Sequence, residues 1–70
     1  MGIEKHIQVT GKSNISWKDA IVQTVEEVSK TINYVTSIKI VNQCAKIATG
    51  KITEYSVDLD ITFMVEQAKQ

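Results

Sequence analysis

The chain has 70 residues, in which eight basic and eight acidic side chains cancel, and it carries one histidine and one cysteine. We expect a single domain over residues 1–70, and because such short chains bury only about 60% of their unfolded surface, stability is marginal. A lone cysteine forms no intrachain disulfide, which leaves oligomerisation as the available source of stability. The balanced charge argues against a nucleic-acid partner. The sequence shows no signal peptide and no run of about 20 apolar residues. We therefore expect a soluble cytoplasmic protein that does not associate with a membrane.

The first predicted element is a strand over residues 3–10, where apolar and polar residues alternate. Gly11 is expected to end this strand. His6 falls on its polar face, and we interpret it as a solvated side chain.

A helix is predicted after a short loop. Ser16 is a suitable N-cap, and from Trp17 the apolar residues recur at helical spacing over about 17 residues. Asn33 is expected to stop the helix. Trp17 lies on the apolar stripe, so we interpret it as an anchor in the core.

Two long strands follow, over residues 34–47 and 52–65, and the second alternates without interruption from Tyr55. A four-residue turn over residues 48–51 would pair Ile47 with Ile52 and fix the register of the hairpin. On the apolar side this register pairs Ile38 with Ile61, Ile40 with Leu59 and Cys44 with Tyr55. On the polar side it pairs Ser37 with Thr62, Lys39 with Asp60, Val41 with Asp58 and Gln43 with Ser56.

This order of elements predicts an α+β fold, βαββ, with a three-stranded antiparallel sheet curled around one helix. The helix would span about 26 Å, whereas the last strand would span about 46 Å. One helix cannot cover such a sheet, so apolar strand ends such as Ile47 would project beyond it. Exposed apolar ends and unpaired edges favour association, and we therefore predict a closed homo-oligomer.

The sequence contains no nucleophile motif, phosphate-binding glycine loop or paired metal-ligand histidines, and no enzyme is predicted. Cys44, placed inside the sheet, is interpreted as a buried structural residue. Asp58 and Asp60 project from one face of the last strand, where Lys39 can neutralise Asp60. They would contribute to a Ca²⁺ or Mg²⁺ site only if other subunits supplied further oxygens.

The layout resembles the dodecins, small βαββ proteins of about this length that assemble as hollow dodecamers. The resemblance covers nearly the whole chain without gaps. It rests on VTG at residues 9–11, Ser16 and Trp17 opening the helix, VTSIKIVNQ at residues 35–43, Tyr55, and DITF at residues 60–63.

The resemblance implies a non-catalytic homododecameric shell that binds or stores flavin, as FMN, riboflavin or FAD. The implied flavin site contains Ser37, Gln43 and Ser56, which the expected register places on one polar face. Flavin-binding dodecins carry a stacking tryptophan where this chain has Ser37 and a glutamine where it has Ser56. The resemblance therefore implies weak or absent flavin binding. The alternative is a flavin-free structural or calcium-binding assembly, with Asp58 and Asp60 as the metal ligands.

Overall fold

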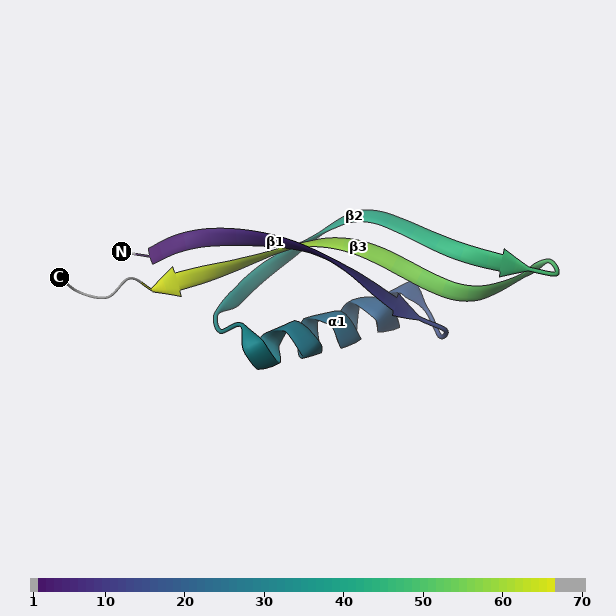
Figure 1. Ribbon diagram of the computed structural model, residues 1–70, viewed down its shortest axis with the longest axis horizontal. Coiled ribbons are helices and arrows are strands. Elements are labelled where there is room, and N and C mark those ends of the chain that lie inside the picture. The colour runs from purple at the N-terminus through teal and green to yellow at the C-terminus, as the bar shows by residue number, and fades with distance from the viewer. Residues whose placement is uncertain (1, 67–70) are drawn as a thin grey trace.

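The computed structural model describes residues 2–66, which form β1 (Gly2–Ser13), α1 (Trp17–Thr31), β2 (Val35–Ala48) and β3 (Lys51–Glu66). β3 lies in the centre of the sheet and pairs antiparallel with β1 on one side and β2 on the other. α1 lies across one face of the sheet (Figure 1). This arrangement confirms the predicted α+β fold with βαββ order.

The helix begins where the sequence predicts, because Ser16 Oγ accepts a hydrogen bond from the Asp19 backbone N–H at 2.9 Å. The carboxylate of Asp19 accepts a further bond from Ser13 Oγ at 2.6 Å. Ser13 is the last residue of β1, so the strand runs past Gly11, contrary to the prediction. The end of β1 is therefore tied directly to the first turn of α1.

The core is formed by Ala20 of α1 and by Val57, Leu59 and Ile61 of β3, each no more than 1% exposed. Successive strand side chains alternate between faces, so these three β3 residues mark the face that meets the helix. Partly buried apolar side chains pack around this cluster: Ile7, Val9, Trp17, Ile21, Val28, Val35 and Ile38.

The sheet is much longer than its helix. The 15 residues of α1 span about 22 Å, whereas the molecule measures 60 × 19 × 12 Å. The hairpin of β2 and β3 extends well past one end of α1 (Figure 1). Near its tip Ile47 is 69% exposed and Ile52 is 45% exposed, which confirms that apolar strand ends project beyond the helix.

The hairpin turn is tighter than predicted. It consists of two residues, Thr49 and Gly50, with φ of 54° and 75°. Two successive positive φ values are typical of a type I′ turn, whose twist matches that of the flanking strands. Ala48 and Lys51, predicted as parts of the turn, pair with each other instead.

The predicted register of β2 on β3 is confirmed at both ends of the hairpin, but the prediction is wrong for the residues in between. Ser37, Ile38, Lys39 and Ile40 pair with Thr62, Ile61, Asp60 and Leu59, and Ile47 pairs with Ile52. A register shift between Ile40 and Asn42 leaves Val41 as an extra residue, which is a β-bulge. The observed middle pairs are Asn42 with Asp58, Gln43 with Val57, Cys44 with Ser56 and Ala45 with Tyr55.

The bulge reverses the face of the sheet to which each side chain in the middle of β2 projects. Gln43 lies opposite Val57, which faces the helix, so Gln43 is on the helix side and not on the polar face as predicted. Cys44 lies opposite Ser56 and is exposed, so its interpretation as a buried structural cysteine is wrong.

We predict that Gly11→Ala destabilises the fold by about 1–3 kcal/mol, as for other additions to a packed contact. A Cβ at Gly11 would collide with Thr24 Oγ1 and lie 3.1 Å from the Ala20 backbone carbonyl oxygen. Urea unfolding would measure the loss. Gly2→Ala is the control, since a Cβ there meets the flexible Met64 side chain at 2.8 Å. Equal stabilities of the two variants would contradict the prediction.

Candidate functional site

The face of the sheet opposite α1, here called the outer face, is predominantly polar. Its members are identified by pairing, because partners on antiparallel strands project to the same side. They include His6, Gln8 and Thr10 of β1, Ser56, Asp58, Asp60 and Thr62 of β3, and Ser37, Lys39, Asn42 and Cys44 of β2. Of the three residues proposed for a flavin site, Ser37 and Ser56 share this face, and Gln43 does not.

A hollow of about 390 Å³ lies on the outer face beside the β2 bulge. It is lined by Gln8, Val9, Thr10, Val41, Asn42, Asp58 and Leu59. Thr10 Oγ1 donates a hydrogen bond to Asp58 Oδ1 at 2.8 Å, which fixes the carboxylate against β1. Two amides, a hydroxyl and one carboxylate therefore converge on one open hollow, a set that suits a polar ligand or a cation.

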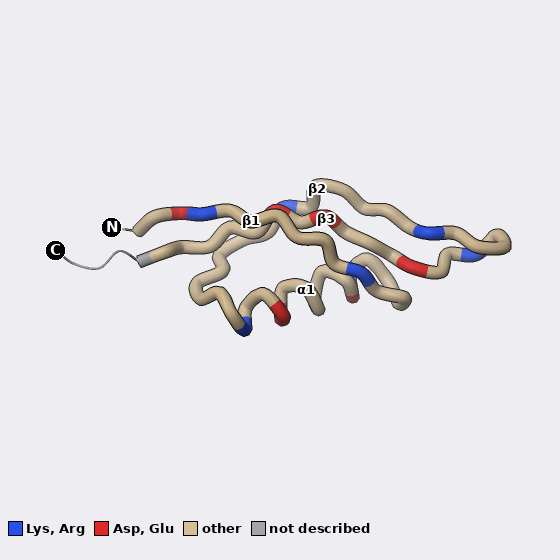
Figure 2. The backbone as a smooth tube through the Cα atoms, in the orientation of Figure 1, with Lys and Arg blue, Asp and Glu red and all other residues tan. Residues whose placement is uncertain are grey.

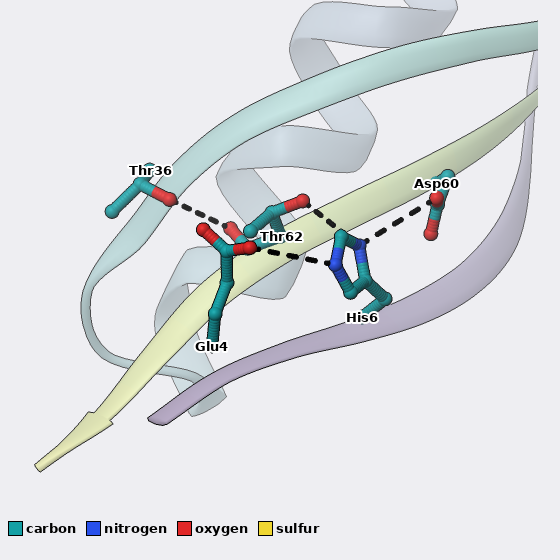
Figure 3. Close-up of polar contacts among 5 residues, drawn as sticks. All are labelled: Glu4, His6, Thr36, Asp60 and Thr62. Carbon is teal, nitrogen blue, oxygen red and sulfur yellow. Dashed lines mark hydrogen bonds and ion pairs between the residues drawn. The ribbon is translucent and has the colours of Figure 1, made fainter. Parts of the chain in front are cut away.

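A second polar cluster centres on His6, which the sequence left as a solvated side chain (Figure 3). Its Nδ1 lies 3.0 Å from Thr62 Oγ1 and 3.6 Å from Asp60 Oδ2, and its Nε2 lies 3.7 Å from Glu4 Oε1. The cluster ties β1 to β3. Thr62 is only 8% exposed, so its hydroxyl is not an accessible nucleophile despite the histidine beside it.

The two carboxylates proposed as metal ligands have different partners. Asp58 is bonded to Thr10, whereas Asp60 approaches His6 and not the lysine that was expected to neutralise it, although Lys39 is its cross-strand partner. Within residues 2–66, no group of three or more histidine, cysteine, aspartate or glutamate side chains is placed to hold a metal ion. A cation site at either aspartate would therefore need oxygens from the Gln8, Thr10 and Asn42 side chains or from another subunit.

Trp17 lies on the helix side of the sheet and not on the outer face. Its indole Nε1 donates a hydrogen bond to the Cys44 carbonyl oxygen at 2.8 Å. Its ring meets Tyr55 edge to face, with centroids 4.9 Å apart at 76°. These contacts agree with its interpretation as a core anchor, and they keep it from serving as a stacking surface beside Ser37.

The fold and the polar outer face define this protein as a small βαββ protein with a long sheet that its single helix covers only in part (Figure 1). The sequence model of the Dodecin family matches residues 3–66. The chain therefore belongs to the dodecin family.

Solved structures show the same fold. A variant of the dodecin of Thermus thermophilus has a TM-score of 0.89 at 21% identity, covering 96% of this chain and 100% of that chain. The dodecin of Streptomyces coelicolor gives 0.89 at 19% identity, covering 96% of both chains. A Mycobacterium tuberculosis protein, described as a calcium dodecin with a novel calcium-binding site, gives 0.79 at 22% identity, covering 97% of both.

A search of curated proteins found no significant match. In the part of the chain that the structure describes, the helix is too short and too polar to cross a membrane.

Proposed function

We propose that this chain assembles into a homododecameric shell that binds or stores a small ligand and catalyses no reaction. The observation that carries this proposal is the outer-face hollow, where polar groups from all three strands converge. The uncovered ends of the sheet support assembly, because contacts between subunits would bury their exposed apolar side chains. Such burial would add to a fully buried core of only four residues, which is small for a chain of this length. Each chain would act as one dodecin-like domain in the cytoplasm.

Flavin is the ligand that membership of the family implies, and Ser37 makes its binding weak. The resemblance to flavin-binding members puts a stacking tryptophan at this position and a glutamine at Ser56. Both serines lie on the outer face, so the face is retained and the aromatic surface is lost. Stacking on an aromatic side chain contributes about 1–3 kcal/mol per base in nucleic-acid complexes, and flavin rings are planar in the same way.

Calcium is the second candidate ligand, and the geometry of Asp58 favours it. Its carboxylate stands in a hollow with the hydroxyl of Thr10 and the side-chain amides of Gln8 and Asn42, all of which offer the oxygen ligands that Ca²⁺ takes. Asp60, two residues along the same face, would add a second carboxylate from this chain or a neighbouring one. The calcium dodecin among the similar structures supports this alternative.

We predict that native mass spectrometry of the purified protein gives a mass of twelve chains. The expected reason is that exposed apolar residues at both ends of the sheet leave a single copy poorly stabilised. Any retained flavin or metal would add its own mass to the assembly. A mass of one chain at micromolar concentration would overturn the proposed shell.

We predict that Ser37→Trp strengthens FMN or riboflavin binding about 5- to 150-fold, the equivalent of one stacking contact. Quenching of flavin fluorescence would measure the affinities of the wild type and the variant. Ser29→Trp, at an exposed position on α1, is the matched control and should leave binding unchanged. Submicromolar binding by the wild type, or no gain in Ser37→Trp, would contradict this interpretation of the site.

We predict that calcium raises the melting temperature if the second candidate is correct, because a ligand at one hundred times its Kd stabilises by about 2.7 kcal/mol. Asp58→Asn should abolish the shift while preserving the shape of the side chain. Glu27→Gln on the exposed surface of α1 is the control and should retain it. A calcium shift that survives in Asp58→Asn would exclude this residue as a ligand.

A further inference from the structure

The outer-face hollow carries one charged side chain among its lining residues. Asp58 supplies a carboxylate, and the remaining lining residues are uncharged: Gln8, Val9, Thr10, Val41, Asn42 and Leu59. The volume of about 390 Å³ lies within the range of pockets that hold small organic molecules, about 300–1,000 Å³. The hollow therefore has room for a molecule that meets one negative charge and several neutral polar groups.

The carboxylate of Asp58 keeps part of its hydrogen-bonding capacity. Thr10 Oγ1 donates to Oδ1 at 2.8 Å, and within residues 2–66 no basic side chain forms an ion pair with Asp58. Oδ2 can therefore accept a hydrogen bond from a ligand, and the side-chain amides of Gln8 and Asn42 can both donate and accept. An ionised carboxylate only accepts, so a ligand group that lies against it must carry a hydrogen to donate.

The lysines of the outer face lie beside the hollow and do not line it. Lys39 pairs with Asp60 and Lys12 pairs with Ser56, so each lies two residues, about 7 Å, from Asp58 along β3. Asp60 offsets the charge of Lys39, and Lys12 lines a separate hollow between β1 and α1. The basic residues of the three strands are spread along the sheet (Figure 2). The charge that a ligand in the outer-face hollow meets directly is thus negative.

We infer that the outer-face hollow selects uncharged ligands rich in hydroxyl groups and rejects anions, and that Asp58 determines this specificity. The inference rests on the proposed binding function and names the class of its ligand. A hydroxyl group can donate a hydrogen bond to the carboxylate of Asp58. A phosphate ester carries about −1.5 to −2 charges at pH 7, so the same carboxylate repels it.

Among the flavins that family membership implies, this specificity favours riboflavin. The side chain of riboflavin ends in uncharged hydroxyl groups, whereas FMN and FAD carry phosphates there. Ser56, a residue of the implied flavin site, lies on the outer face two residues, about 7 Å, from Asp58. The hollow therefore adjoins the position at which a flavin is implied, and the phosphate is the part of the ligand that Asp58 excludes.

The test compares riboflavin with FMN by quenching of flavin fluorescence, at low salt and with EDTA so that no metal ion bridges the phosphate to Asp58. The two molecules differ by one phosphate, so the ratio of their dissociation constants isolates its effect. Riboflavin should bind about tenfold or more tightly than FMN, both in the wild type and in Ser37→Trp, which is expected to bind both ligands more tightly. High salt should narrow the ratio, because it screens exposed charges.

Variants of Asp58 separate its charge from its shape. Asp58→Asn removes the charge and preserves the shape, and it should bring the two dissociation constants to within about threefold of each other. Asp58→Glu retains the charge and should retain the preference for riboflavin. Glu27→Gln is the matched control, because it removes the same charge from the surface of α1, where Glu27 pairs with Lys30. It should keep the wild-type ratio, and far-UV circular dichroism would show that all three variants fold.

The outcomes separate this inference from the proposed function. Binding of neither flavin, by the wild type or by Ser37→Trp, overturns the proposed flavin binding and this specificity with it. Binding of FMN as tightly as riboflavin leaves flavin binding in place and overturns only the specificity. A preference for riboflavin that persists unchanged in Asp58→Asn, or that is lost in Glu27→Gln, would overturn the role of Asp58.

Discussion

The structure depends on a mismatch between one helix and the sheet it must cover. A helix advances about 1.5 Å per residue and a strand about 3.3 Å, so the 15 residues of α1 can cover less than half the length of the 16-residue β3. The helix is also narrow, and it is drawn onto β1 and β3 by the close contact at Gly11. Both the projecting hairpin (Figure 1) and the exposure of Ile40 on the helix side of β2 follow from that placement.

Much of the fold could be predicted from the sequence because each element has a local signal. The uninterrupted alternation of β3 identifies its buried face, and Ser16 fixes the start of α1. The end of β1 was predicted wrongly at Gly11, since the glycine there serves close packing against Thr24 and does not turn the chain. Its role depends on a tertiary contact that no local pattern reports.

The candidate site could be predicted only in part, because a bulge leaves little local trace. Ile40 and Ile47 are both apolar, but they are seven residues apart, and in a regular strand an odd separation puts two side chains on opposite faces. They share a face only if one extra residue is inserted between them as a bulge. The odd separation of these two apolar residues was the available signal for the bulge at Val41. The His6 cluster could not be predicted either, since it depends on the register of β1 against β3, which no turn fixes.

The same inserted residue affects both faces of β2. It brings Val41 and Asn42 together beside Asp58, which forms the hollow on the outer face. It also returns Ile47 to the side of Ile40, and a second register shift, between Lys46 and Ile47, pairs Ile47 with Ile52. Removing one residue at this point would move Ile47 to the outer face and Gln43 away from the helix side. The two faces of β2 are therefore coupled through its register, so an insertion or deletion near Val41 that alters the hollow also changes which side chains face the helix.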